Sequence, residues 1–99
     1  MKLIIAIVRP FTVEKIVNAF EAIEGFPGMT VVDSEGFGQR HPAVQSSSLD
    51  PFKPGKRIEI SANDEMVPII TAAILKSAHT GKIGDGVIMV VDIDTAFKI

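Results

Sequence analysis

The stretch KLIIAIVRPFTVEKIVNAFEAI, residues 2–23, decides the fold. Residues 3–8 form a continuous apolar run rich in β-branched side chains, which is typical of a short strand buried on both faces or nearly so. Pro10 ends the run, and Thr12 is the predicted N-cap of a following helix. Beyond it, apolar residues recur at the spacing of an amphipathic helix, at Val13, Ile16, Val17, Phe20 and Ile23. Gly25 and Pro27 stop this helix, and residues 29–34 predict a second strand.

The second half of the chain repeats this order. Residues 56–62 alternate between apolar and polar side chains, as in a half-buried strand, and Asn63 or Asp64 is the predicted cap of a second helix. Residues 87–91 predict a fourth strand, and the tail 94–99 a short strand or turn. The inward-facing residues expected on the second helix are Val67, Ile70, Ile74 and Leu75, with Ala78 near its end.

Two strand–helix–strand units in one chain predict an α+β, ferredoxin-like βαββαβ sandwich. It has one antiparallel sheet with both helices on one face. Residues 1–99 form one domain, and the uncovered sheet face together with 46% apolar residues favours an oligomer. A net charge of −2 argues against general nucleic-acid binding, and the lack of cysteine excludes disulfides and thiolate chemistry. The apolar start is too short to span a bilayer, so we expect a soluble, cytoplasmic protein.

Two glycine-rich segments are the candidate ligand-binding loops. TGKIGDG, residues 80–86, lies between the second helix and the fourth strand, and GFG, residues 36–38, follows the second strand. Glycines let backbone N–H groups approach a ligand, successive amides attract anions, and Lys82 adds a positive charge suited to phosphate. The alternative is a plain helix C-cap followed by a turn.

Residues 39–55, which join the two halves, contain three prolines, a serine run and no strand or helix period. A structureless loop of this length is unusual in a compact domain and is often functional, although a simple flexible connector is the alternative.

These segments carry a resemblance to the PII signal-transduction family. The matching stretches are KLIIAIVRPF (2–11), GMTV (28–31), GFG (36–38), RIEI (57–60) and TGKIGDG (80–86), in the family's order and over nearly the whole chain. The resemblance implies a homotrimer that binds an adenine nucleotide in the cleft between subunits. Residues 80–86 would be the phosphate-holding B-loop. Residues 39–55 would be the T-loop, which touches a partner protein.

The resemblance also implies a set of nucleotide-binding residues. They are Met29, Thr30, Gly36, Phe37, Gly38, Gln39, Glu59, Ile60, Ser61, Thr80, Gly81, Lys82, Ile83, Gly84, Asp85, Gly86, Val87 and Lys98.

The chain departs from the family pattern at several of the positions that contact ligands. It has no tyrosine, which excludes uridylylation, and Gln39-Arg40 inverts the family's Arg-Gln order. Gly55 stands where the family has a lysine for 2-oxoglutarate, and Val87 where it has a phosphate-binding lysine. Lys98 stands at the first of two arginine positions. These changes predict poor 2-oxoglutarate recognition and a preference for ADP or AMP over ATP.

The sequence therefore predicts a non-enzymatic, PII-like regulator that acts on a partner such as a membrane transporter. The alternative is a trimeric metal-tolerance protein of similar fold that uses His41, and a third hypothesis is an inert trimer with a degenerate site. For single residues, Glu59 is also expected to form a cross-strand ion pair, His79 to cap its helix or neighbour the nucleotide, and Asp85 to form a turn.

Overall fold

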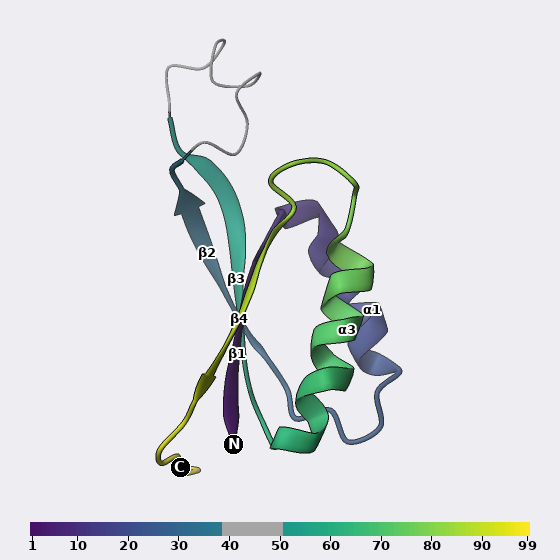
Figure 1. Cartoon of the computed structure of the whole chain (residues 1–99), viewed down its shortest axis with the longest axis vertical. Coiled ribbons are helices and arrows are strands. Elements are labelled where there is room, and N and C mark those ends of the chain that lie inside the picture. The colour runs from purple at the N-terminus through teal and green to yellow at the C-terminus, as the bar shows by residue number, and fades with distance from the viewer. Residues whose placement is uncertain (39–50) are drawn as a thin grey trace.

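The predicted strand and helix order is confirmed by the computed structural model, which describes residues 1–38 and 51–99 (Figure 1). The elements are β1 (Lys2–Val8), α1 (Val13–Glu21), β2 (Thr30–Gly36), β3 (Lys53–Ala62), α3 (Val67–Ala78) and β4 (Gly86–Asp92), with single 3-10 turns at Pro10–Thr12 and Asp64–Met66. The strands follow the order β2-β3-β1-β4, and each neighbouring pair is antiparallel. This is the ferredoxin-like α+β sandwich.

The hydrophobic core lies between the sheet and the two helices, which cover the same face of it (Figure 1). Side chains alternate between the two faces of a strand, and every second residue of β1 and β3 is buried on the helix side. The core is formed by Ile4, Ala6 and Val8 of β1, Ile58, Ile60 and Ala62 of β3, Ile16 and Phe20 of α1, and Ile70, Ile74 and Ala78 of α3.

The opposite sheet face is apolar and exposed. Met89 pairs with Ile5, whose neighbours Ile4 and Ala6 point to the helices, so Met89 points away from them. By the same alternation Val87 and Val91 share this face, and the three side chains are 40–47% exposed. The expected uncovered face is therefore present in the single chain.

The helix starts differ from the prediction in one respect, because neither helix is capped by a side chain. Thr12 stands directly before α1, but its hydroxyl donates a hydrogen bond of 2.8 Å to the Arg9 carbonyl oxygen. Asn63 and Asp64 likewise form no cap, and Asp64 pairs with the N-terminal amine at 3.0 Å. A 3-10 turn before each helix replaces the predicted cap.

Two further predictions were wrong in detail. β3 begins at Lys53, so residues 53–55 of the predicted loop are strand. Pro54 is tolerated because β1 pairs with β3 only from Lys56 onward, which leaves Pro54 with a single neighbouring strand. Leu75, expected to face inward, is 63% exposed because Ile74 occupies the centre of the buried stripe.

The tail after β4 forms no regular element, although the Ile93 amide donates to the Met1 carbonyl oxygen at 3.2 Å. Among the described residues no helix is long and apolar enough to cross a bilayer.

Candidate functional site

Glycines determine the path of the loop at residues 80–86 that joins α3 to β4. Gly81, Gly84 and Gly86 have φ angles of 85°, 94° and 135°, which L side chains rarely adopt. At Gly86 there is a second reason, because a Cβ there would stand 2.1 Å from the Ile7 carbonyl oxygen on β1. The glycine pattern read from the sequence is thus required by the backbone.

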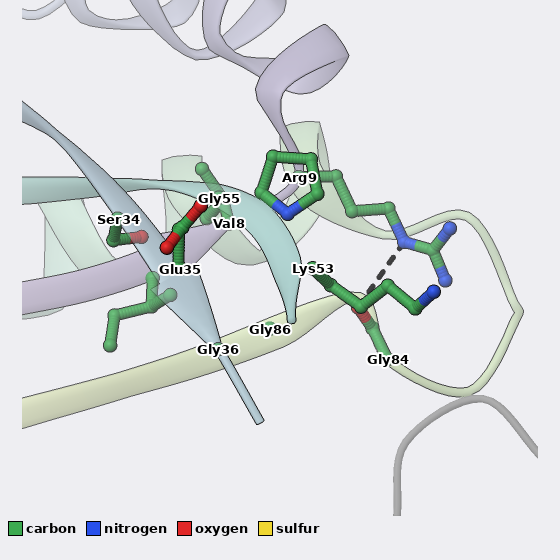
Figure 2. Close-up of a pocket in the computed structure, with 11 residues that line it drawn as sticks. Val8, Arg9, Ser34, Glu35, Gly36, Lys53, Gly55, Gly84 and Gly86 are labelled. Atoms are coloured by element: carbon green, nitrogen blue, oxygen red, sulfur yellow. Dashed lines mark hydrogen bonds between the residues drawn. The ribbon is translucent and has the colours of Figure 1, made fainter. Parts of the chain in front are cut away.

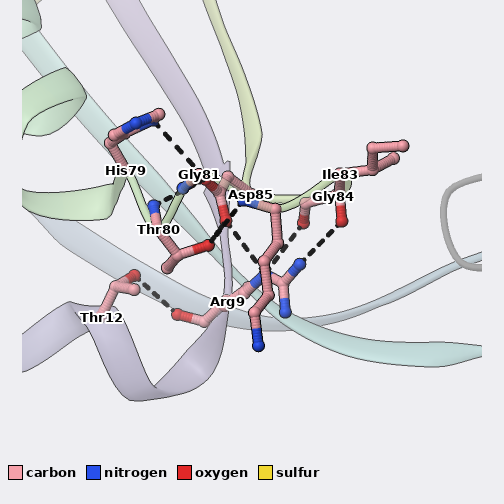
Figure 3. Close-up of polar contacts among 9 residues, drawn as sticks. Arg9, Thr12, His79, Thr80, Gly81, Ile83, Gly84 and Asp85 are labelled. Atoms are coloured by element: carbon pink, nitrogen blue, oxygen red, sulfur yellow. Dashed lines mark hydrogen bonds and ion pairs between the residues drawn. The ribbon is translucent and has the colours of Figure 1, made fainter.

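Asp85 is the centre of this loop's hydrogen bonds (Figure 3). Its carboxylate accepts the Thr80 amide at 2.7 Å and the Gly81 amide at 3.2 Å, and it also accepts the Thr80 hydroxyl. The predicted turn-forming role of Asp85 is confirmed, since the carboxylate closes the loop on itself.

These contacts favour the ionised form of Asp85. The Thr80 hydroxyl, followed by the Thr80 amide, lowers the pKa of the Asp85 carboxyl, and the Gly81 amide and Arg9 act in the same direction. Asp85 therefore carries a negative charge wherever the loop has this structure at neutral pH.

Arg9 holds the second part of the loop, residues 83 and 84, through its side chain (Figure 3). From the end of β1, its guanidinium donates to the Ile83 carbonyl oxygen at 2.8 Å and to the Gly84 carbonyl oxygen at 3.2 Å. Its Nε also lies 3.3 Å from an Asp85 carboxylate oxygen. Arg9 was not predicted as a site residue, although its place directly after the first strand could have suggested it.

The loop offers fewer free amides than the sequence predicted. The Thr80 and Gly81 amides donate to Asp85, and the Lys82 amide donates to the Thr80 hydroxyl at 3.3 Å. Within the described part of the chain, the Ile83 and Gly84 amides donate no hydrogen bond. The Lys82 side chain is exposed beside them. An anion at this loop would meet two amides and one ammonium group.

The two glycine-rich segments meet at a cavity of about 120 Å³ (Figure 2). Gly36 at the end of β2 lies on one side of it, with Gly84 and Gly86 on the other. Arg9 and Lys53 add two positive charges to the lining and Glu35 adds one negative charge. Lys53 was not predicted as a site residue either, because the sequence left it in the loop.

The other predicted nucleotide contacts lie elsewhere on the sheet. The loop end of the sheet is marked by Val8, which pairs with Lys56 on one side and with Gly86 on the other. Thr30 pairs with Glu59, which lies three residues along β3 from Lys56. At about 3.3 Å per residue, this places Thr30 and Glu59 about 10 Å from the loop end of the sheet, with Met29, Ile60 and Ser61 farther along the strands. The C-terminal tail, which contains Lys98, follows β4 and ends at the opposite end of the molecule from the glycine loop (Figure 1).

Interactions within the fold engage two residues of this second group and also the nearby Lys56. Glu59 pairs with Arg57 at 2.8 Å along the same strand, which corrects the predicted cross-strand pair. Ile60 is 1% exposed beneath the helices, so only its backbone could meet a ligand. Lys56, next to Gly55, pairs with Asp33 on β2.

Phe37 and Phe52 form an aromatic contact at the base of the loop between β2 and β3, with ring centroids 5.8 Å apart. Gly38 follows Phe37, whereas the predicted contact Gln39 and most of the T-loop lie outside the described residues. His41 does as well, so the metal hypothesis remains a prediction. Elsewhere, in residues 1–38 and 51–99, no group of three or more His, Asp or Glu side chains could hold a metal ion.

His79 ends α3 as its C-cap residue, which confirms the predicted capping position. Its imidazole Nδ1 lies 3.7 Å from an Asp85 carboxylate oxygen.

Comparison with known proteins supports the resemblance along the whole chain. The family model described as nitrogen regulatory protein P-II matches residues 1–99. P-II 2 of Methanothermobacter thermautotrophicus is 40% identical over 103 aligned positions, which cover 100% of this chain and 89% of that protein. P-II of Rhizobium etli is 38% identical and P-II 1 of Escherichia coli K12 is 35% identical, each with 100% of this chain and 91% of the relative covered.

Proposed function

The chain belongs to the nitrogen regulatory P-II family, and we propose that it is a trimeric regulator that binds ADP or AMP between its subunits. P-II proteins are non-enzymatic signal transducers that form trimers, bind target proteins and generally respond to adenine nucleotides. The proposal concerns which nucleotide this chain takes, which residues hold it and what the protein then regulates.

The observation that carries the proposal is the cavity where Gly36 meets Gly84 and Gly86. Backbone at glycine positions can approach a ligand closely, and Arg9, Lys53 and Lys82 supply positive charge around it. The free Ile83 and Gly84 amides point to the same use, since backbone N–H groups are good phosphate donors. The phosphates would lie against this loop.

The predicted nucleotide contacts are spread along the sheet of a single chain. The group around Thr30 and Glu59 lies about 10 Å from the glycine loop along the strands. Lys98 is farther still, because β4 extends six residue steps, about 20 Å, between Gly86 and Asp92. We infer that these residues reach the nucleotide from the neighbouring subunit, so that each site combines the glycine loop of one copy with the sheet and tail of another.

The assembly would bury the exposed sheet face. Val87, Met89 and Val91 form an apolar row there, flanked on the other edge strand by Val32, which is 46% exposed. Burial of apolar surface is the dominant favourable term in most protein association, and a chain of this size has only a small core of its own. Light scattering at micromolar concentration tests the assembly, and a stable monomer would contradict it.

The preference for ADP or AMP follows from the limited positive charge of the loop. Asp85 is ionised, the amides of residues 80–82 are engaged within the loop, and Val87 replaces a cation. Each added phosphate therefore brings negative charge that the positive charges and free amides of the loop compensate less fully than that of the phosphate before it.

For the partner, we propose that residues 39–55 contact a membrane transporter or its regulator from the cytoplasm. Support comes from the base of this segment, where Phe37 and Phe52 and the Gly36–Lys53 pair join it directly to the nucleotide cavity. A ligand in the cavity would thus act at the root of the partner-binding segment.

Calorimetry with AMP, ADP and ATP tests the proposal most directly. We expect binding of ADP and AMP, with ATP weaker. No binding by any of the three at millimolar concentration would overturn the proposed function.

A further inference from the structure

His79 lies where a change of its charge would act on the glycine loop. Its imidazole is 74% exposed, and its Nδ1 lies 3.7 Å from Asp85 Oδ2 (Figure 3). That same oxygen accepts hydrogen bonds from the amides of Thr80 and Gly81, the first two residues of the loop. The imidazole therefore shares one carboxylate oxygen with the backbone that shapes the loop.

Several other charged groups lie near His79. Arg9 lies on the far side of the Asp85 carboxylate, with its Nε 3.3 Å from Oδ1. Glu14 and Lys15 of α1 line a cavity of about 220 Å³ together with His79 and offset one another in charge. Lys76 on the last turn of α3 and Lys82 in the loop are cationic.

Among all these groups, imidazole is the side chain that ordinarily gains or loses its proton between about pH 5 and 8. Asp85 stays ionised in this range because its hydrogen bonds lower its pKa.

We propose that His79 is a positioning residue that makes nucleotide binding at the glycine loop dependent on its protonation, an inference that rests on the proposed function. When protonated, the imidazolium stands beside Oδ2 as Arg9 stands beside Oδ1, so that the Asp85 charge is balanced from both sides. It also adds one positive charge beside the first part of the loop, through its contact with Asp85. When His79 is neutral, the carboxylate charge is compensated from the Arg9 side only and repels the phosphates more strongly.

The direction of the pH effect follows from this arrangement. The protonated form binds an anionic nucleotide more tightly, so affinity falls as pH rises through the range in which His79 loses its proton. By linkage, nucleotide binding takes up protons in the same range. Because exposed ion pairs are weak, we expect His79 to contribute a loss of about two- to fivefold in ADP affinity between pH 6 and pH 8, measured as the difference between the wild type and His79→Gln.

The chain offers a matched control, since its only histidines are His41 and His79. ADP affinity is measured by calorimetry at pH 6 and pH 8 for the wild type, His79→Gln, His79→Lys and His41→Gln. We expect His41→Gln to keep the wild-type slope. In His79→Gln the part of the pH dependence that comes from His79 should disappear, and ADP affinity should stay at the weaker value expected for neutral His79. In His79→Lys the same part should disappear, and ADP affinity should stay at the tighter value expected for protonated His79. The ionisation of ADP itself is common to all four proteins and cancels in the comparison. An unchanged slope in His79→Gln would overturn the inference even if ADP binds.

A second measurement needs no nucleotide and separates this inference from the proposed function. In the free protein, the NMR amide signals of Thr80 and Gly81 should shift with pH along the same curve as the His79 ring signal. The shift should disappear in His79→Gln and persist in His41→Gln. If the Thr80 and Gly81 amides do not follow His79, the coupling is absent, whatever the protein binds. If they follow it but no nucleotide binds, the proposed function fails while the coupling between His79 and the loop stands.

Discussion

Gly86 approaches the Ile7 carbonyl oxygen so closely that a Cβ atom at position 86 would stand 2.1 Å from that oxygen. The contact joins the end of the glycine loop to β1, where Val8 pairs with Gly86. The glycine is thus required for pairing of the two strands as well as for the loop's φ angle of 135°.

Gly86→Ala should therefore destabilise the fold by about 2–4 kcal/mol, from backbone strain together with the steric clash. Thermal or denaturant unfolding measures the loss. Gly81→Ala is the matched control, because Gly81 also has a positive φ, of 85°, but a Cβ there meets no atom within 4 Å. It should cost about 1–2 kcal/mol. Equal losses in the two variants would show that the contact with Ile7 does not matter.

The sequence predicted this part of the molecule unevenly, for physical reasons. Glycine spacing showed that residues 80–86 form a special backbone, and alternation of apolar residues placed the strands and core. What the pattern could not show is which side chain organises the loop. The link from Arg9 to Ile83 and Gly84 joins residues more than 70 positions apart, and only the antiparallel pairing of β1 and β4 brings them together.

The errors have similar causes. Strand β3 extends back to Lys53 because pairing with β2 continues through Pro54, and this pairing has no local signal. Leu75 follows Ile74 directly, so periodicity alone could not decide which of the two occupies the buried stripe. The split of the predicted nucleotide residues into two separate groups depends on strand direction, which spacing along the chain does not give.

Arg9→Gln should loosen the glycine loop while leaving the sheet intact. It removes the guanidinium that donates to the Ile83 and Gly84 carbonyl oxygens. Hydrogen exchange of residues 80–86 should speed up by about tenfold or more, as expected when charged hydrogen bonds worth on the order of 1.5 kcal/mol are lost. Arg57→Gln is the control, because Arg57 pairs with Glu59 on β3, away from the loop. Unchanged exchange in Arg9→Gln would show that the loop keeps its shape without this residue.

The loop should also loosen in acid, because protonation of Asp85 removes the charge that its hydrogen bonds stabilise. Its pKa is lowered in the folded protein, first by the Thr80 hydroxyl. The stabilisation that ionised Asp85 gives to the folded protein is therefore fully present at pH values above the ordinary carboxyl pKa. It is lost as the pH falls through the lowered pKa of Asp85. Thr80→Val should move the Asp85 pKa back toward its usual range, as measured by NMR titration. Lys2→Gln is the control, because Lys2 lowers the pKa of Asp92 instead. A Thr80→Val variant with an unmoved Asp85 pKa would contradict the hydrogen bonding described above.

Lys82→Ala should weaken nucleotide binding through loss of charge. Lys82 is exposed in the loop beside the free amides of Ile83 and Gly84, and its backbone is held by Thr80. The loss should be on the order of 1–3 kcal/mol, as for hydrogen bonds to charged groups, and should be larger for ADP than for AMP. Lys76→Ala, which removes a charge from α3, should change affinity far less. Equal effects of the two substitutions would mean that only the net charge of the protein matters.

Val87→Lys should raise nucleotide affinity, and should do so most for ATP. Val87 directly follows Gly86 and pairs with Ile7, so it stands at the glycine-loop end of the apolar row that the proposed trimer buries. A longer side chain at this end can extend toward the loop without displacing the core between the sheet and the helices. An ammonium group there would compensate the phosphate charge that the loop, with its ionised Asp85 and engaged amides, leaves unmet. Val87→Gln is the control, because it adds a polar side chain of similar reach without the charge. Calorimetry with AMP, ADP and ATP should show the ATP-to-ADP ratio rising in Val87→Lys and unchanged in Val87→Gln. If the lysine leaves that ratio as it is, the phosphates do not lie against residues 80–87, and the proposed nucleotide site loses its main support.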